Sequence, residues 1–357
     1  MKKNQIGINN RSVKSGAMKK NRFTFSSGST DCYFLGSIAQ LDHLADPATT
    51  VVVTDQHVYR HHRSLFAKWN TIVLRAGERY KIQATVDALV ERLVSLQADR
   101  STTLVGVGGG VVTDLVGYTA AIYMRGIRVG FVPTTLLAMV DAAIGGKNGV
   151  DVGVYKNLVG TIRQPSFLLY DMALLKTLPL TEWKNGFAEI IKHAAILDAK
   201  MFASLERRSL SFYQKNKSAL ALLIAQNAKL KIKVVQADEQ ERGRRKWLNF
   251  GHTLGHALEN QYQLSHGQAI SLGMVMAARL SAHYVRFTDT SRLESLLSRY
   301  GLPTEATFHL KKTISILRMD KKKQGDQIDY VLVKKIGSAT VHSVAFDELE
   351  KIIAKRS

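Results

Sequence analysis

Short runs of β-branched and other apolar residues alternate with helical stretches over residues 23–178. The runs that predict strands are 50–54, 71–74, 102–107, 130–132 and 167–170. Between them, segments such as 81–96 repeat apolar residues at helical spacing, which predicts amphipathic helices. Strands that alternate with helices are typical of a parallel sheet covered by helices. The pattern therefore predicts an α/β domain over this part of the chain.

The hydrophobic pattern changes after residue 178, where strand-like runs almost disappear. It predicts helices at 182–198, 218–238, 252–262, 269–284 and 291–300, several with Gly or Pro at their ends. Only 327–334 and 338–344 resemble strands, and they form a late pair. Before residue 23 the chain carries seven basic residues and no acid, which predicts a flexible basic tail over 1–22. We therefore expect an α/β domain at 23–178 and a mostly α-helical domain at 179–357.

The composition excludes several classes of protein. Of the 357 residues, 45% are hydrophobic and 22% are charged, the balance of a folded globular protein. The one cysteine, Cys32, has no partner within the chain, so a disulfide framework is excluded. The most apolar stretch, 111–146, is interrupted by charged residues and does not predict a membrane helix. The amino terminus lacks the apolar segment of a secretory signal, so we expect a cytoplasmic protein with no membrane contact.

The charge is strongly positive, because 50 Lys and Arg outnumber 29 Asp and Glu to give a formal net charge of +21. Such a field attracts nucleic acids and also small anions. The basic residues are spread along the whole chain, without zinc-finger spacing or an aromatic RNA-binding motif. The sequence therefore favours a small anionic substrate, and we expect no nucleic-acid partner.

A cluster of glycines follows the strand predicted at 102–107 and precedes a predicted helix. It comprises Gly106, Gly108, Gly109 and Gly110. Glycines at such a turn let the backbone approach a phosphate and direct amide groups towards it. The spacing differs from the GxGxxG dinucleotide fingerprint, and glycines here also fit a purely packing role.

A second turn of this kind follows the strand predicted at 130–132 and carries Thr134 and Thr135. A threonine there fits either a helix cap or a ligand contact. Polar residues continue within a Gly-rich, otherwise apolar stretch, and they include Asp141, Lys147, Lys156 and Asn157. Charged residues in such surroundings often face a ligand. The two turns together indicate a nucleotide and anion site in the first domain.

Acidic and histidine side chains on predicted helices of the second domain indicate a metal site. Glu189 and His193 share one helix face at a spacing of four residues. His252 and His256 share a face of a later helix, and His266 opens another. One carboxylate and histidines from separate helices form the ligand set of a catalytic zinc. Spacing alone leaves open which two of the four histidines would join Glu189.

The ordered set of motifs resembles the 3-dehydroquinate synthase family from about residue 54 to residue 337. The motifs are GGGVVTDLVG, YMRG, PTTLLAMVDAAIGGK, YKNLVG, LKTLP, GFAEIIKH, LNFGHTLGHALE, HGQAISLGMVMA and MDKKK, with a KxxVVxxDExExGxR pattern within 231–245. Each motif is weak alone, but the set in this order is specific. The resemblance implies an NAD-binding α/β domain with a parallel sheet, followed by a mostly α-helical, metal-binding domain.

The resemblance also implies an activity and its cofactors. The family converts 3-deoxy-D-arabino-heptulosonate 7-phosphate, a small anionic sugar phosphate, to 3-dehydroquinate and phosphate in the shikimate pathway. In this carbon–oxygen lyase reaction NAD takes a hydride from C5, phosphate leaves by β-elimination, the hydride returns, and an intramolecular aldol step closes the ring. A divalent metal, zinc or else cobalt, acidifies the hydroxyl that is oxidised.

Site residues follow from the resemblance at the matching positions. The implied metal ligands are Glu189, His252 and His266. The implied substrate and catalytic residues are Arg125, Asp141, Lys147, Asn157, Lys192, Lys231, Glu241, Arg245, Asn249, His256 and Lys321. The implied NAD-binding residues are Asp55, Glu78, Lys81, Gly109, Gly110, Asp114, Thr134, Thr135, Lys147, Lys156, Thr177 and Glu182. Glu241 is expected to orient Arg245, and Arg125 to reach the active site of a neighbouring subunit in a homodimer.

Other interpretations remain open. Sister sugar phosphate cyclases, which make 2-deoxy-scyllo-inosose or 2-epi-5-epi-valiolone, share the fold, NAD and the metal but differ where a substrate carboxylate is held. A metal-dependent polyol dehydrogenase would lack the cluster of cations, because its substrates carry no phosphate. A basic nucleic-acid-binding protein would explain the charge but not the Glu–His–His set. Without the family, Arg245 fits a solvated residue of the basic run 242–246.

Overall fold

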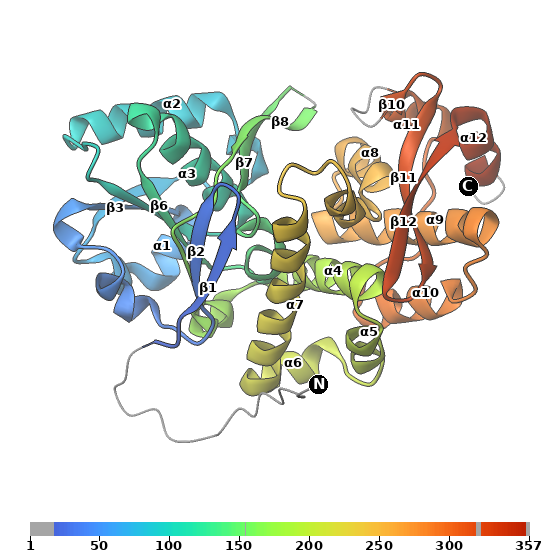
Figure 1. The fold of residues 1–357 in the computed structure, drawn as a ribbon, viewed down its shortest axis with the longest axis horizontal. Helices are drawn as coiled ribbons and strands as arrows, with labels where there is room; N and C mark the ends of the chain where they lie inside the picture. Colours follow the sequence, from blue (N-terminus) through green and yellow to red (C-terminus); the bar gives the residue numbers. More distant parts are fainter. Residues whose placement is uncertain (1–17, 154, 319–322, 355–357) are drawn as a thin grey trace.

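The fold is built on a parallel sheet, and the predicted α/β domain followed by a mostly helical domain is confirmed (Figure 1). The computed structural model describes residues 18–153, 155–318 and 323–354. Its seven-stranded sheet has the order β1-β2-β9-β6-β5-β3-β4. The strands are β1 (Asn21–Phe25), β2 (Gly28–Tyr33), β3 (Thr50–Asp55), β4 (Asn70–Leu74), β5 (Thr103–Gly108), β6 (Arg128–Pro133) and β9 (Phe167–Leu169). Every neighbouring pair except β1–β2 is parallel.

Alternation of side chains along the strands gives the sheet two apolar faces. Val51 and Val53 of β3 pack on the face covered by α2 (Gln83–Ser95) and α3 (Gly110–Ile122), whereas Val52 packs on the opposite face. Short helices cover that second face, and they are α1 (Gln56–His62), η1 (Ile38–His43), η3 (Arg63–Phe66) and η7 (Met172–Thr177). Strands buried on both faces have continuous apolar sequences. For this reason the runs of β-branched residues predicted these strands from the sequence.

The hairpin of β1 and β2 lies where the sequence predicted no strands. The two strands pair antiparallel at one edge of the sheet, and β1 begins at Asn21. The expected flexible tail over 1–22 is therefore wrong for its last two residues, which pair with β2; residues 1–17 lie outside the described residues. Arg22 forms an ion pair with Asp31 of β2, with Nε and Oδ1 2.7 Å apart. Backbone pairing and an ion pair with β2 thus order a segment whose basic composition alone predicted a flexible tail.

A second unpredicted hairpin joins β7 (Lys147–Val152) to β8 (Tyr155–Ile162) and projects from the sheet (Figure 1). Gly149 and Gly160 face each other across it. A Cβ on Gly160 would come within 2.2 Å of the carbonyl oxygen of Asn148, so this approach of the two backbones requires glycine. The hairpin carries several of the polar residues singled out from the sequence.

The second part of the chain is helical apart from a small antiparallel sheet. Its helices are α4 (Leu180–Leu197), α5 (Ala199–Glu206), α6 (Leu210–Lys215), α7 (Lys217–Ala237), η8 (Arg244–Asn249), α8 (His252–Tyr262), α9 (His266–Val285), α10 (Thr290–Arg299), α11 (Leu310–Leu317) and α12 (Phe346–Ala354). In the small sheet, β11 (Gln327–Lys335) and β12 (Ser338–Ala345) are the predicted pair, and β10 (Lys323–Gln324) is added to it. Within the described ranges, no helix has the length and apolarity needed to span a bilayer.

The change from sheet to helices comes at Pro179, which precedes the first residue of α4. One hydrophobic core nevertheless runs through both parts, from Leu136 and Met139 to Phe187 of α4 and Ile232 of α7. Figure 1 shows α4 and α7 lying between the sheet and the remaining helices. The division into two domains at residue 178 therefore stays a prediction.

The helices α8 and α9 meet in direct backbone contact. A Cβ on Gly273 of α9 would lie 1.8 Å from the carbonyl oxygen of Gly251, the residue just before α8. Gly251 itself has a φ of 79°, which residues with a side chain rarely adopt. A Cβ on Gly255, one turn into α8, would lie 3.0 Å from the carbonyl oxygen of Ala269. These glycines set how closely the first turn of α8 approaches α9.

We predict that Gly273→Ala lowers the free energy of unfolding, although Gly→Ala inside a helix normally raises it by up to about 1 kcal/mol. The added methyl group would overlap the Gly251 carbonyl, and overpacking of this kind costs about 1–3 kcal/mol. Urea unfolding followed by circular dichroism measures the change. As a control, Ala282→Gly at an exposed position of α9 should cost only about 1 kcal/mol through helix propensity. A Gly273→Ala variant as stable as the wild type would contradict the close contact.

Candidate active site and metal centre

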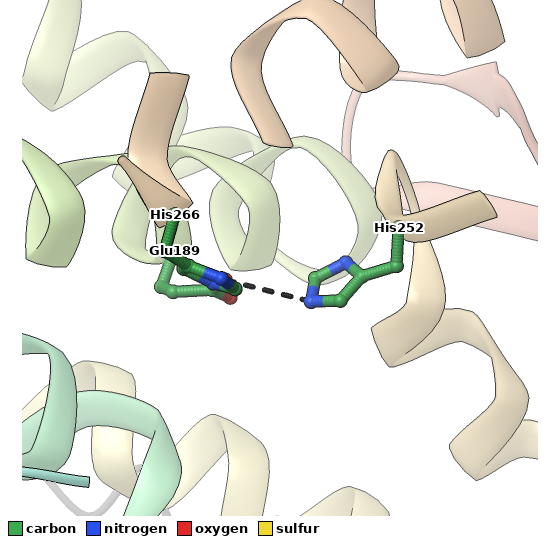
Figure 2. Close-up of side chains that lie close together, drawn as sticks. All are labelled: Glu189, His252 and His266. Atoms are coloured by element: carbon green, nitrogen blue, oxygen red, sulfur yellow. Dashed lines mark hydrogen bonds and ion pairs between the residues drawn. The ribbon is translucent and has the colours of Figure 1, made fainter. Parts of the chain in front are cut away.

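Three helices bring one carboxylate and two imidazoles together. Glu189 lies in the middle of α4, His252 is the first residue of α8, and His266 is the first residue of α9. Their ligand atoms lie within 4.8 Å of one another. Glu189 Oε1 is 2.8 Å from Nε2 of His266 and 3.6 Å from Nε2 of His252. Figure 2 shows the ring of His252 directed towards Glu189 and His266 from the opposite side.

Burial of Glu189 determines the electrostatics of this cluster. Its side chain is fully buried, and burial alone would raise the pKa of its carboxyl group. Lys192, one turn further along α4, contacts the carboxylate, and its charge holds the pKa of Glu189 well below its ordinary value. The site therefore contains a buried carboxylate ion, which requires positive charge around it.

Hydrogen bonds orient both histidines with a ring nitrogen towards Glu189. Nδ1 of His252 lies 3.1 Å from the carbonyl oxygen of Phe250, which leaves its Nε2 for the cluster. Burial and the charge of Lys192 lower the pKa of His252 to about 3, so this ring is neutral at pH 7. Burial alone would lower the pKa of His266, but contacts with Glu189 and a second carboxylate raise it to about 9.

The three groups fit a divalent ion such as zinc. Catalytic zinc binds imidazole nitrogens and a carboxylate oxygen at about 2.0–2.2 Å in a tetrahedron, which separates ligand atoms by about 3.3 Å. The observed separations of 2.8 and 3.6 Å lie on either side of that value. Three protein ligands leave coordination positions for substrate oxygens. The donor set and its burial therefore match what a catalytic zinc site requires.

The two other candidate histidines have different neighbours. Nδ1 of His193 lies 2.8 Å from the amide oxygen of Asn227, and its Nε2 lies 3.3 Å from Oδ1 of Asp141. The ring of His256 packs edge-on against that of His252, with ring centroids 5.2 Å apart. The arrangement favours His252 and His266 as the partners of the α4 carboxylate.

Buried lysines surround Asp141 beside this cluster. Lys231 Nζ lies 2.6 Å from Oδ1 of Asp141, and Lys192 Nζ lies 4.0 Å from Oδ2. Burial alone would raise the pKa of Asp141, but Lys192 and Lys231 hold it far below its ordinary value. Asp141, Glu189 and His193 also lie within 4.8 Å of one another. Lys192 and Lys231 already supply positive charge to the two carboxylates of that second group, which therefore forms a salt-bridge network.

The segment before α8 buries Arg245. Its Nη1 donates to the carbonyl oxygen of Glu239 at 2.6 Å, and its Nη2 donates to that of Gly145 at 2.8 Å. Only 2% of Arg245 is exposed, whereas Arg244 is exposed and stacks on the ring of Trp247. The alternative that Arg245 is a solvated residue of a basic run is therefore wrong.

Glu241 has other partners than the sequence predicted. Its Oε1 accepts a hydrogen bond from the side-chain amide of Asn249 at 2.6 Å, and its Oε2 contacts Nζ of Lys147. The guanidinium of Arg245 instead donates to main-chain oxygens. The prediction that Glu241 orients Arg245 is wrong, because the loop directs Glu241 towards β7, where Lys147 begins the strand. Glu241 orients Lys147 and Asn249.

Predicted cofactor residues gather at the carboxyl ends of adjacent parallel strands. Asp55 ends β3, Gly109 and Gly110 follow β5, and Thr134 and Thr135 follow β6. These strands are neighbours in the order β6-β5-β3. The chain connections change direction between β3 and β5, and ligands of parallel α/β sheets bind at such a switch point. The topology favours a nucleotide site here, while the individual contacts stay predictions.

Two of these residues also cap helices. Asp55 Oδ1 accepts from the backbone N–H of His57 at 2.8 Å and that of Val58 at 3.0 Å. Thr135 Oγ1 accepts from the backbone N–H of Ala138 at 3.1 Å. The helix-cap alternative therefore applies to Thr135, which leaves Thr134 as the better candidate for a ligand contact.

A buried lysine at the same edge joins α3 to the β7–β8 hairpin. Lys81 Nζ forms an ion pair with Asp114 of α3 and lies 2.5 Å from the amide oxygen of Asn157 on β8. Burial raises the pKa of Asp114 in spite of Lys81. Glu78, on the short helix η4 (Glu78–Tyr80), adds a further negative charge beside the lysine. Four of the predicted residues thus form one polar cluster.

The remaining predicted residues are more dispersed. Thr177 ends η7, and Glu182 lies in the first turn of α4. Lys156 of β8 forms an ion pair with Glu259 of α8 at 2.6 Å, which joins the hairpin to the helical part. Lys321 lies outside the described residues.

Arg125 lies at the opposite edge of the sheet. It follows α3, which runs from the carboxyl end of β5 back to the amino end of β6. Arg125 is exposed, as are the apolar side chains of Ile122 and Met124 beside it. Within one subunit, the fold therefore does not bring Arg125 to the edge that carries the other predicted residues.

Sequence reasoning missed two carboxylates that hold the site. Glu239 accepts hydrogen bonds from Ser26 and Ser27 in the β1–β2 turn and from Gln164 at 2.8 Å. These serine partners lie more than 200 residues away, so local sequence held no signal for the contact. Glu259 did have a signal, because it follows the first residue of α8 by seven positions and shares its helix face.

Two family models match the chain. One, described as 3-dehydroquinate synthase N-terminal, covers residues 71–185, and the other, described as 3-dehydroquinate synthase C-terminal, covers residues 186–323. A curated relative from Pyrobaculum islandicum, named 3-dehydroquinate synthase, is 40% identical over 289 residues. That match covers 79% of this chain and 84% of the relative.

Solved structures of similar fold carry bound cofactors. The 2-epi-5-epi-valiolone synthase from Streptomyces hygroscopicus subsp. jinggangensis 5008, with NAD+ and Zn2+ bound, has a TM-score of 0.84 and 26% identity, covering 96% of this chain and 99% of its own. A 2-deoxy-scyllo-inosose synthase complexed with carbaglucose-6-phosphate, NAD+ and Co2+ has a TM-score of 0.84 and 24% identity, covering 95% and 100%. At that identity the second likeness establishes the fold alone.

We predict that Glu239→Gln lowers the free energy of unfolding by about 2 kcal/mol at pH 7, because a charged hydrogen-bond acceptor is lost. Burial alone would raise the pKa of Glu239, but hydrogen bonds from Ser26, Ser27 and Gln164 lower it from 4.5 to about 2. A lowered pKa in the folded state contributes stability above the unfolded pKa, and this contribution is lost as the pH falls towards 2. The difference between wild type and variant should therefore narrow below pH 4.5.

Urea unfolding at pH 7 and at pH 3.5 measures this difference. Glu91→Gln removes an exposed carboxylate from α2 and serves as the control, with little change expected at either pH. If Glu239→Gln lowers the free energy of unfolding equally at both pH values, the charge of the Glu239 carboxylate does not strengthen its hydrogen bonds with Ser26, Ser27 and Gln164.

Proposed function

The chain belongs to the 3-dehydroquinate synthase family, and we propose that it converts 3-deoxy-D-arabino-heptulosonate 7-phosphate to 3-dehydroquinate and phosphate, the second step of the shikimate pathway. The observation that carries the proposal is the position of Glu189, His252 and His266 beside a group of buried cations. A metal ligand set next to buried positive charge suits a substrate with a hydroxyl to activate and with carboxylate and phosphate groups to bind.

Glu189, His252 and His266 would hold the divalent ion, which we propose to be zinc, with cobalt able to use the same donors. When bound, this ion would supply Lewis-acid polarisation of the substrate hydroxyl. The chain prepares the site for it. Lys192 keeps Glu189 ionised, and the Phe250 carbonyl fixes the His252 ring so that Nε2 faces the ion.

The buried cations would bind the anionic groups of the substrate. Arg245 has a planar guanidinium that matches the two oxygens of a carboxylate, and it is already held by two main-chain oxygens. Lys192 and Lys231 present ammonium groups in surroundings of low dielectric, where attraction to an anion is stronger than in water. Further polar contacts to the substrate would come from Asp141, Lys147, Asn157, Asn249 and His256, with His256 near the phosphate.

NAD would lie across the carboxyl ends of β3, β5 and β6, where it would take a hydride from the substrate and return it. Backbone amides of Gly109 and Gly110 at the start of α3 suit its pyrophosphate. The other residues that we propose for NAD are Asp55, Glu78, Lys81, Asp114, Thr134, Thr135, Lys147, Lys156, Thr177 and Glu182. Both the hydride carrier and the metal would then meet the substrate between the sheet and α4.

A homodimer would explain Arg125, because this residue is remote from the site of its own subunit. Ile122 and Met124 beside it are 40% and 43% exposed, and Tyr155 and Leu158 of β8 are 46% and 53% exposed. Exposed apolar groups of this extent on neighbouring elements suit a protein interface. We propose that a second copy covers them and receives Arg125 in its active site.

An assay of three sugar phosphates tests the proposed function. With NAD and zinc, we expect phosphate release and a cyclic product from 3-deoxy-D-arabino-heptulosonate 7-phosphate, and none from glucose 6-phosphate or sedoheptulose 7-phosphate. EDTA should abolish turnover without changing the circular dichroism spectrum, because the helices around the site belong to a large hydrophobic core. Turnover of either of the other two substrates would point to a sister cyclase, and full activity after EDTA would contradict the metal site.

We predict that Arg245→Lys lowers kcat/KM at least tenfold, which corresponds to a loss of at least about 1.4 kcal/mol in transition-state binding. Lysine keeps the charge but loses the two parallel hydrogen bonds that a guanidinium makes to a carboxylate. Arg244→Lys is the matched control, because Arg244 is exposed and stacks on Trp247. Steady-state kinetics of both variants decide the question. Equal, small effects would remove the support for a substrate carboxylate at Arg245.

A further inference from the structure

His266 lies between two carboxylates. Its Nε2 is 2.8 Å from Oε1 of Glu189, and its Nδ1 is 3.7 Å from Oε2 of Glu259. Glu259 lies two turns after His252 on the same face of α8. One helix therefore supplies both a candidate metal ligand and the carboxylate behind the next ligand.

The two oxygens of Glu259 have different surroundings. Oε1 accepts from Nζ of Lys156 on β8 at 2.6 Å. Oε2 is buried and has no hydrogen-bond partner within the part of the chain that the structure describes. A buried carboxylate oxygen without a donor is costly, and Nδ1 of His266 is the nitrogen that faces it. The separation of 3.7 Å between Oε2 and Nδ1 is longer than a hydrogen bond, and a rotation of the Glu259 side chain would shorten it.

We propose that Glu259 is a positioning residue that accepts a hydrogen bond from Nδ1 of His266 and so holds Nε2 towards the divalent ion. The inference rests on the proposed metal site. A histidine that binds a metal through Nε2 carries its proton on Nδ1, and a carboxylate that accepts this proton fixes the tautomer and the plane of the ring. Such partners commonly contribute a factor of about 10–100 to metal affinity.

Lys156 extends this arrangement to the other part of the chain. Lys156 lies on the β7–β8 hairpin, which packs against α3. Its ammonium group forms an ion pair with Glu259 of α8. The orientation of His266 thereby depends on where the hairpin lies. Lys156 would then serve the metal site as well as the nucleotide site proposed for it.

Competition for zinc with a chromophoric chelator tests the proposal in the full-length protein. Glu259→Gln keeps the size of the side chain and removes its charge, and we expect zinc affinity to fall at least tenfold. Glu294→Gln is the matched control, because it removes a half-buried carboxylate from the ion pair that joins α10 to Arg279 of α9. Its zinc affinity should equal that of the wild type. Wild-type affinity in Glu259→Gln, or an equal loss in both variants, would overturn the proposal.

A second variant covers the case in which Glu259→Gln does not fold. Glu259→Asp keeps the charge but shortens the side chain by one methylene, so the carboxylate no longer reaches Nδ1 of His266, and we expect zinc affinity to fall about tenfold. Unchanged affinity in Glu259→Asp would then overturn the proposal. His252→Ala separates this inference from the metal site itself. If the wild type and His252→Ala bind zinc equally, the proposed metal site fails, whereas a loss in His252→Ala without a loss in Glu259→Gln rejects only the role of Glu259.

Discussion

The fully buried carboxylate of Glu189 is the constraint on which the rest of the active site depends. An ionised carboxylate cannot remain inside a protein core unless positive charge and hydrogen-bond donors surround it. Lys192 on the same helix contacts Oε2 of Glu189, and two imidazoles from other helices face its Oε1. The convergence of α4, α8 and α9 is thus required by electrostatics as much as by packing. A divalent cation between these groups completes the same balance of charge.

Elements buried on both sides were predictable from the sequence, and elements at edges were not. The strands β3, β5 and β6 consist of apolar, β-branched runs because helices cover both of their faces, and the long helices after residue 178 repeat apolar residues at helical spacing. The hairpins β1–β2 and β7–β8 instead contain glycines and charged residues without a regular alternation. Their order comes from backbone pairing, as between Gly149 and Gly160, which composition does not encode.

The candidate site divides in the same way. Motifs shared with a family indicated the proposed metal ligands, the buried arginine and the glycine turn, all of which belong to short, recognisable segments. Spacing alone could not choose between His193 and His252, because both lie on helices beside acidic groups, and only the tertiary structure shows that His193 faces Asn227 and Asp141. The partners of Glu239 and Glu241 were equally inaccessible. Apart from the contact between Glu241 and Asn249, these contacts join segments that are far apart in the sequence, and no local pattern indicates which distant side chain will be the partner.

The backbone contact between α8 and α9 has a consequence for how this protein scaffold can diversify. Because Gly251 and Gly273 meet main chain to main chain, no side chain of these two residues separates the helices at this point. Residues lining the rest of the site can change their size and charge while the imidazole positions remain the same. The 2-deoxy-scyllo-inosose synthase and the 2-epi-5-epi-valiolone synthase have this fold, although only 24% and 26% of the aligned residues are identical to those of this chain. The close main-chain contact is therefore compatible with variation in the residues that would contact the substrate around the proposed metal site.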